Sequence, residues 1–119
     1  MTAYRQIIAR SLSLLRDNRF AVIVVGDVRD KKGLYRNFVG DTVQAFIDAG
    51  ARLYNEAILV SPLGSLPVRA GGPFTKSRKL GKTHQNVLVY VKGDPVEATK
   101  FCGAVDVADA LAQFGEGEE

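Results

Sequence analysis

The chain has 119 residues, which suits one domain, and 46% of them are hydrophobic, which is enough for a buried core. The longest apolar run, residues 20–25, is far too short to span a membrane, and residues 1–5 do not lead into the apolar stretch of a signal peptide. The single cysteine, Cys102, excludes an internal disulfide and fits a reducing compartment, so a cytoplasmic location is expected.

The net charge of +3 hides an uneven distribution along the chain. Residues 1–93 carry 15 Lys or Arg against 6 Asp or Glu, a net +9, whereas residues 94–119 carry 1 against 7, a net −6. One interpretation is a solvated surface followed by an acidic, solubilising tail. The other is a body that binds a polyanion, because its positive charge is concentrated in one segment.

The first three predicted elements alternate between helix and strand. Apolar residues at three- and four-residue spacing predict a helix over residues 3–16. Residues 20–25 form a continuous, β-branched run, which is typical of a strand buried on both faces in the middle of a parallel sheet. A second amphipathic pattern predicts a helix over residues 34–49, and Gly50 is its stop signal.

A polar loop, residues 26–33, comes after the carboxyl end of that first strand. Ligands of open α/β sheets bind at such a position. Asp27 and Asp30 flank Arg29 in this loop. The two acidic residues have two interpretations: a local ion pair combined with a helix N-cap, or a contact to a ligand at the edge of the sheet.

Two further strands are predicted over residues 52–60 and 86–92, and these last two strands are expected to be antiparallel. The segment between them, residues 61–85, is much longer than a hairpin loop of about 2–5 residues. Between residues 57 and 93 the chain has no Asp or Glu and six basic residues: Arg69, Lys76, Arg78, Lys79, Lys82 and Lys92. An uninterrupted positive loop suits the phosphate backbone of a nucleic acid.

Motifs for other chemistries fail on spacing. Residues 81–83 have the Gly-Lys-Thr end of a phosphate-binding loop, but Lys76 stands where that motif needs its first Gly, and the segment leads into a strand. The only histidine, His84, and Cys102 offer no metal-ligand spacing, so no metal site is expected. His84 also lacks an evident Ser or Cys nucleophile beside it. It is interpreted as a structural or DNA-facing polar residue, or as a substrate contact, and no catalytic residue is assigned.

Three segments of the chain resemble amino-group DNA methyltransferases, and more narrowly the site-specific DNA methylases of phage type. These segments are residues 20–30, 53–60 and 78–93, and the resemblance extends from residue 3 to about residue 100. The third segment is the most distinctive, because a histidine, His84, precedes a final apolar strand that ends in a lysine, Lys92.

The resemblance implies a fold. In that family the catalytic domain is a mostly parallel sheet with a reversed last strand. Residues 1–100 would form the C-terminal portion of such an α/β domain: a partial methyltransferase-like, Rossmann-like sheet that is mostly parallel and ends in an antiparallel closing hairpin. Residues 101–119 would form an acidic, partly disordered tail, with a short helix around residues 105–114.

The resemblance also implies which functional parts are present. The family binds S-adenosylmethionine through a Gly-containing loop and holds a flipped base with a Pro-Pro-aromatic motif, and this chain matches only the region C-terminal to that motif. It contains no Pro-Pro dipeptide and no Phe-x-Gly-x-Gly. The chain alone is therefore expected to have no S-adenosylmethionine cofactor and no methyl transfer activity. Gly26, Asp27 and Arg29 would at most line one wall of the cofactor pocket.

Double-stranded DNA is the expected ligand. Residues assigned to this DNA contact lie in the basic segment between the last two strands or at its end: Arg69, Lys76, Arg78, Lys79, Lys82 and His84. Because the strand over residues 20–25 would lack the neighbour it has in the family, it would expose an unpaired apolar edge. A second chain or a homodimer is therefore expected to cover that edge.

Three hypotheses remain open at this level. The chain is the C-terminal half of a DNA methyltransferase that docks onto a second chain carrying the cofactor half. Alternatively, it is a non-catalytic protein that binds nucleic acid. Finally, it is a structural or regulatory protein that pairs through its exposed sheet edge, with itself or with a partner.

Overall fold

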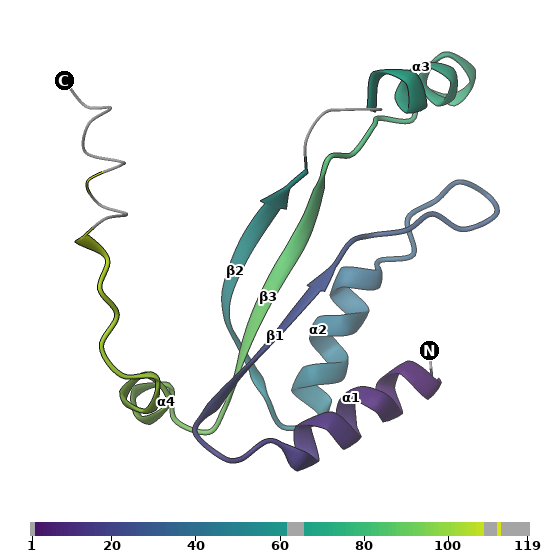
Figure 1. The fold of residues 1–119 in the computed structure, drawn as a ribbon. Helices are drawn as coiled ribbons and strands as arrows, with labels where there is room; N and C mark the ends of the chain where they lie inside the picture. The colour runs from purple at the N-terminus through teal and green to yellow at the C-terminus, as the bar shows by residue number, and fades with distance from the viewer. Residues whose placement is uncertain (1, 62–65, 109–111, 113–119) are drawn as a thin grey trace.

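The computed structural model describes residues 2–61, 66–108 and 112. In chain order the elements are α1 (Thr2–Leu14), β1 (Arg19–Val25), α2 (Phe38–Asp48), β2 (Arg52–Val60), α3 (Leu66–Ser77), β3 (His84–Lys92) and α4 (Pro95–Cys102). In Figure 1, α1 and α2 lie together beside the sheet, α3 stands beyond one end of the strands, and α4 lies at the other end. Within this described part, no helix is long and apolar enough to cross a membrane.

The three strands form one sheet in the order β1-β3-β2. β3 occupies the middle and is antiparallel to both neighbours: Val22 lies opposite Val89 in the β1–β3 pair, and Ala57 lies opposite Val87 in the β2–β3 pair. β1 and β2 therefore run in the same direction without pairing. Each of them has one edge that is unpaired within the described part of the chain.

The predicted fold class is wrong. The sequence predicts a mostly parallel, Rossmann-like sheet, but every pair of neighbouring strands among the described residues is antiparallel. A continuous apolar run indicates that a strand is buried, but it does not specify the direction of the strand beside it. Here the long β2–β3 connection brings β3 back between the two strands of common direction. One part of the prediction is confirmed: the last two strands, β2 and β3, are antiparallel.

Several predicted boundaries also need correction. α2 begins at Phe38 and not at residue 34, because residues 28–36 are held in a loop of their own by a bridge between Arg29 and Tyr35. The connection between β2 and β3 is not irregular throughout, since it contains α3. α1 ends at Leu14 and not at residue 16, and Asn18, just before β1, has a positive φ of 58°.

A helix after the last strand lies earlier than expected. α4 starts directly after β3, because the Asp94 side chain accepts a hydrogen bond from the Val96 N–H and Pro95 occupies the first turn. The helix expected around residues 105–114 and the acidic tail fall mainly on residues 109–111 and 113–119, which lie outside the described residues.

The core lies between the sheet and helices α1 and α2. The largest fully buried side chains are Tyr90, Leu88 and Thr42, two of them from β3. The Tyr90 ring stacks on Phe46 of α2, with 3.9 Å between ring centroids. Burial of each large apolar side chain contributes about 1.5–3 kcal/mol, so this contact joins the central strand firmly to the helical layer.

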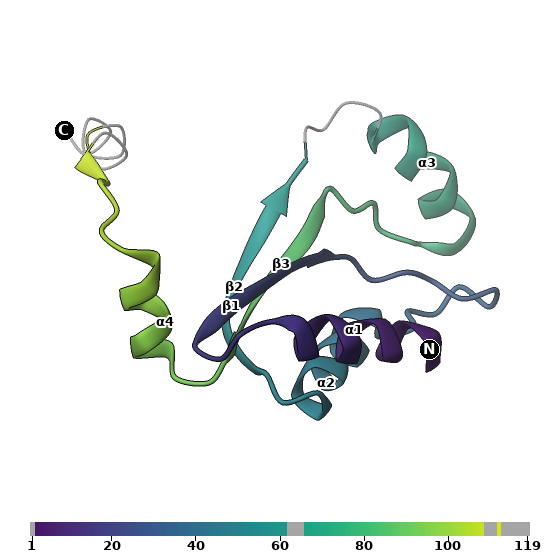
Figure 2. The same ribbon diagram turned by 60° about the horizontal axis from the view of Figure 1, so that its bottom comes forward.

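The opposite face of the sheet is largely uncovered. We call it the outer face; its residues alternate with those facing the core. Its apolar residues are Phe20, Val22, Val24, Tyr54, Ala57, Leu59, Val87, Val89 and Val91, and its polar residues are Arg52, Asn55 and Gln85. Figure 2 shows α1 and α2 on the same side of the strands. β1 is therefore buried on one face only, contrary to the prediction from its continuous apolar sequence.

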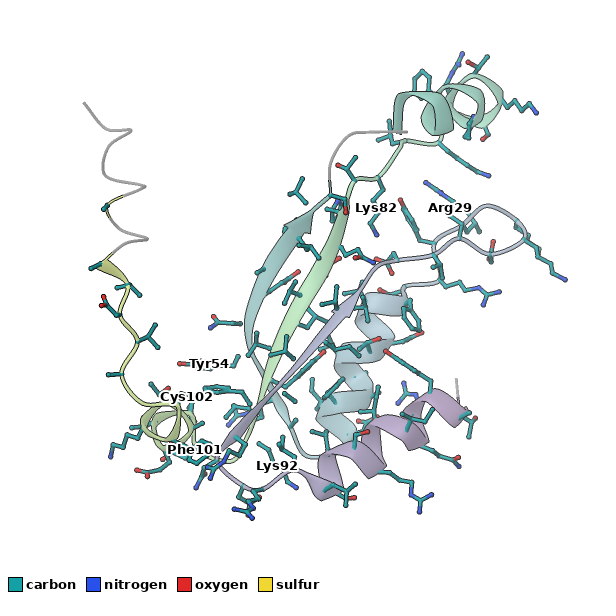
Figure 3. The ribbon with its side chains drawn as sticks, in the orientation of Figure 1. Arg29, Tyr54, Lys82, Lys92, Phe101 and Cys102 are labelled. Atoms are coloured by element: carbon teal, nitrogen blue, oxygen red, sulfur yellow. The ribbon has the colours of Figure 1, made fainter. Side chains whose placement is uncertain are left out.

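Lys92, at the end of β3, fastens the sheet to α1. Its ammonium group donates hydrogen bonds to the carbonyl oxygens of Leu12 (2.6 Å) and Leu15 (2.7 Å), at the C-terminal end of that helix (Figure 3). A positive charge at this place also interacts favourably with the helix dipole. Lys92 therefore has a structural role that separates it from the other basic residues between residues 57 and 93.

The Tyr90 hydroxyl is a buried polar group within this core. It has no hydrogen-bond partner among the described residues. Burial, and secondarily the charges of Tyr4 and Glu56, raise the pKa of Tyr90 to about 12. The folded chain therefore keeps the Tyr90 proton at pH values where the unfolded chain, with an ordinary tyrosine pKa of about 10, has lost it.

Replacing Tyr90 by Phe should raise the free energy of unfolding near pH 7 by up to about 1 kcal/mol, because a buried hydroxyl without a partner is removed. The wild-type chain should lose stability as the pH rises from about 10 to about 12, and Tyr90→Phe should lose less. Urea unfolding followed by circular dichroism at several pH values measures both effects. Tyr54→Phe, at a half-exposed tyrosine, is the control; identical pH profiles for Tyr90→Phe and wild type would contradict the prediction.

Candidate nucleic-acid interface

The pairing of β1 with β3 brings two basic segments to one end of the sheet. Val25, the last residue of β1, lies opposite Asn86 near the start of β3. The loop after β1 and the segment before β3 therefore meet. We call this region, residues 26–37 and 76–84, the cationic end. Figure 3 shows Arg29 and Lys82 there, on the two segments.

The loop after β1 is closed by its own hydrogen bonds. The Asp30 carboxylate accepts from the N–H groups of Lys32 (2.9 Å) and Leu34 (3.0 Å). The Arg29 guanidinium donates to the Gly33 carbonyl oxygen (2.8 Å) and lies 4.2 Å from the centroid of the Tyr35 ring. Gly33 adopts a φ of +85°, which favours glycine. The loop thus presents its cations from an organised backbone.

Asp27 supports the capping interpretation of the acidic residues. Its carboxylate accepts a hydrogen bond from the Val39 N–H (3.1 Å) in the first turn of α2, where the N-cap residue Asn37 makes no side-chain bond. The local ion pair that the sequence suggests beside it is not observed, because neither Asp27 nor Asp30 forms a salt bridge with Arg29. Asp27 therefore helps to begin α2.

Two lysines from the segment before β3 lie over glycines of the other loop. The Lys82 ammonium nitrogen is 3.3 Å from the position that a Cβ atom would take on Gly26, and the Lys79 ammonium nitrogen is 3.0 Å from the equivalent position on Gly33. A side chain at either glycine would crowd the lysine above it. The lack of side chains at these two positions is what lets the basic segments approach closely.

A shallow pocket lies where the segments meet. Its volume is about 250 Å³, and it is lined by Gly26, Asp27, Val28, Lys82, His84 and Gln85. It unites two residues expected at the cofactor site with two expected at the DNA site. Arg29 does not line it. His84 is the first residue of β3, lies opposite Val60 and is exposed.

The remaining predicted DNA-binding residues lie around α3. Lys76 is exposed in the last turn of this helix. Arg78 directly follows α3 and has a φ of 58°. Its guanidinium donates a hydrogen bond to the Phe74 carbonyl oxygen (3.2 Å). The side chain of Arg69 lies outside the described part of the structure.

The cations of the cationic end are not paired with carboxylates. The two salt bridges among the described residues, Arg5–Asp48 and Lys100–Glu97, lie elsewhere. Eight basic residues at this end form no salt bridge with a described residue: Arg29, Lys31, Lys32, Arg36, Lys76, Arg78, Lys79 and Lys82. Such a cluster creates a positive potential that attracts anions. No group of three metal-ligating side chains occurs among the residues described.

Sequence reasoning missed part of this cluster. Lys31, Lys32 and Arg36 are not among the predicted DNA contacts, because they lie in a different segment from the long basic loop. The local signal was present, since residues 29–36 contain four basic residues. Recognising that both segments share one end required the pairing of β1 with β3.

Replacing Asp27 by Ala should lower the free energy of unfolding by about 1 kcal/mol, because α2 loses its side-chain cap. Asp27→Asn should keep most of that stability, since the amide oxygen can still accept from Val39. Asp17→Ala, at an exposed acid before β1, is the control and should stay within about 0.5 kcal/mol of wild type. Urea denaturation measures the differences, and an unchanged stability of Asp27→Ala would exclude the capping role.

Comparison with known proteins found no relative of this chain. No protein-family model, no curated protein and no solved structure matches the chain. The resemblance to amino-group DNA methyltransferases thus rests on residues 20–30, 53–60 and 78–93.

Proposed function

We propose that the chain binds double-stranded DNA through its cationic end, as the DNA-binding and scaffold half of a site-specific DNA methyltransferase. The cofactor-binding and catalytic half would be a separate chain. The observation that carries the DNA part is the convergence of eight basic residues from two distant segments, without a paired carboxylate among the described residues.

An array of this kind suits a polyanion better than a single small anion. The cations are spread over the loop after β1, the end of α3 and the segment before β3. Lysine and arginine side chains on exposed segments can each neutralise one phosphate and release its counterions, which adds affinity for each contact. Phosphate contacts of this type position a protein on DNA without reading its sequence.

The methyltransferase part of this proposal rests on the resemblance to amino-group DNA methyltransferases, and one contact in the structure supports it. Two of the resembling segments, residues 20–30 and 78–93, pair as β1 and β3 and place Lys82 over Gly26. Residues that are distant in the sequence but belong to one family pattern are therefore neighbours at one pocket. This is the arrangement expected if both segments serve the same substrate.

S-Adenosylmethionine, when bound in such enzymes, supplies the methyl group. Two of the three residues expected beside it make other contacts in this chain. The Asp27 carboxylate is bound to α2, and Arg29 is held within its own loop by Gly33 and Tyr35. Only Gly26, whose lack of a side chain keeps the pocket wall open, fits a role as a boundary of the site.

The alternative is a non-catalytic protein that binds nucleic acid. The same cluster of basic residues, which forms no salt bridge among the described residues, supports it equally. The two functions predict the same DNA binding but differ in whether a second chain confers methyl transfer.

Replacing Lys76, Arg78, Lys79 and Lys82 together by Ala should weaken binding to a fluorescein-labelled DNA duplex. The slope of log affinity against log salt concentration should become shallower by about 0.9 for each lost phosphate contact. Fluorescence anisotropy over a series of potassium chloride concentrations measures both values. The control replaces four exposed cations elsewhere, namely Arg10, Arg16, Arg52 and Lys100; equal affinity and slope in the two variants would refute the DNA site.

The purified chain alone should transfer no methyl group from tritiated S-adenosylmethionine to DNA. Mixing it with a chain encoded beside it that carries the Gly-containing loop and the Pro-Pro-aromatic motif should produce transfer. Arg29→Ala should then lower the rate, because the cationic end loses one of its DNA-binding cations. Lys100→Ala, which changes a cation at the other end of the sheet, is the control. DNA binding without transfer by any such mixture would favour the non-catalytic alternative, and transfer by the chain alone would overturn the assignment of a half-enzyme.

A further inference from the structure

A second and larger pocket lies where the loop after β1 meets the start of α2. Its volume is about 450 Å³, compared with about 250 Å³ for the shallow pocket beside Lys82, and it is lined by Val28, Arg36, Phe38 and Asp41. Val28 lines both pockets, so the two hollows adjoin. Pockets of roughly 300–1,000 Å³ are of the size that takes small organic ligands. The proposed DNA contacts use neither Phe38 nor Asp41.

Backbone geometry holds both walls of this pocket in place. On one wall the Arg36 N–H donates a hydrogen bond to the Val28 carbonyl oxygen (2.9 Å). On the other wall Phe38 and Asp41 belong to the first turn of α2 and, being three residues apart, share one face of that helix. Asp27 ties the start of α2 to the loop by its side-chain hydrogen bond. The pocket is therefore a fixed feature of the folded chain.

The pocket combines an apolar wall with one cation and one carboxylate. Phe38 contributes an aromatic ring, whose centroid lies 5.0 Å from that of Tyr4, and Val28 contributes an aliphatic side chain that is half exposed. Neither Arg36 nor Asp41 forms a salt bridge with a described residue. A ligand that fits here has a flat or apolar body, an anionic group for the guanidinium and hydrogen-bond donors for the carboxylate.

A guanine nucleotide meets all three conditions. An ionised carboxylate only accepts hydrogen bonds, and its two oxygens lie side by side. Guanine presents two neighbouring donors, the ring N1–H and the 2-amino group. The amino groups of adenine and cytosine stand beside a ring nitrogen that is itself an acceptor, which a carboxylate repels. A planar base packs well against an aromatic ring, and a phosphate pairs with a guanidinium.

We propose that this pocket binds a guanine nucleotide. The Asp41 carboxylate accepts hydrogen bonds from the N1–H and the 2-amino group, the base lies against Phe38 and Val28, and Arg36 pairs with the phosphate. In a duplex those two donors are occupied by cytosine. The ligand is therefore a free nucleotide or an unpaired guanine in a single strand, and the proposal does not rest on binding of double-stranded DNA.

Nuclear magnetic resonance titration of the isotopically labelled chain tests the proposal, because it measures weak affinities and confirms that each variant is folded. Guanosine 5′-monophosphate should bind about tenfold or more tightly than adenosine 5′-monophosphate, which lacks both donors. Inosine 5′-monophosphate, which lacks only the 2-amino group, should bind with intermediate affinity. Equal affinities for the guanine and adenine nucleotides would overturn the proposal, as would binding of an α-amino acid such as leucine in place of nucleotides.

Asp41→Asn replaces one acceptor oxygen by a donor and should abolish the preference for guanine. Asp41 also lies in the first turn of α2, where a carboxylate stabilises the helix, but such a role does not discriminate between bases. Asp17→Asn, at an exposed acid outside the pocket, is the matched control and should keep the preference. A preference for guanine that survives Asp41→Asn would refute the site.

Guanosine, which has no phosphate, isolates the role of Arg36. Arg36→Ala should weaken binding of the monophosphate by about tenfold and leave guanosine binding unchanged, whereas Arg16→Ala should affect neither. An equal loss for both ligands would refute the phosphate contact.

Single-stranded oligonucleotides distinguish the two sources of the ligand. Fluorescence anisotropy compares a thymine strand that contains one guanine with a strand of thymine alone. Tighter binding of the first strand, reversed by guanosine 5′-monophosphate, identifies an unpaired guanine as a ligand of the pocket. Equal binding of the two strands, together with binding of the monophosphate, identifies the free nucleotide; failure of both the strand and the monophosphate to bind would overturn the proposal.

Discussion

The central position of β3 is the constraint on which the rest of the structure depends. It takes part in every strand pairing of the sheet, since β1 and β2 pair only with it. It also supplies Leu88 and Tyr90 to the core, and Lys92 to the end of α1. A chain in which β3 failed to insert would therefore lose the sheet, the core contact with Phe46 and the anchor of the first helix together.

The same insertion creates the candidate interface. Because β3 is antiparallel to β1, its amino end meets the carboxyl end of β1, and the two basic segments become neighbours. Glycine at positions 26 and 33 then permits the close approach of Lys82 and Lys79. The density of cations at this end thus results from backbone topology and from two missing side chains, and neither segment would produce it alone.

The molecule separates its two kinds of surface. The eight clustered cations lie at one end of the strands, whereas the exposed apolar residues of the outer face lie between the two ends. A polyanion cannot bury apolar side chains, and an apolar layer cannot neutralise lysines, so the two surfaces require different partners. Binding of a polyanion and covering of the outer face would therefore involve different residues.

Sequence alone determined the positions of the strands, the antiparallel pairing of the last two, and the basic segment that includes Lys76, Arg78, Lys79 and Lys82. These depend on local apolar patterning and on composition, which do not require distant contacts. Only the tertiary structure decided the strand order, the uncovered outer face, the capping role of Asp27 and the inclusion of Lys31 and Lys32 in the cationic end. An apolar run indicates that a strand is suited to burial. The relative direction of its neighbours and the layer that covers it depend on which other segments of the chain pack against the strand, and a local sequence pattern does not specify those segments.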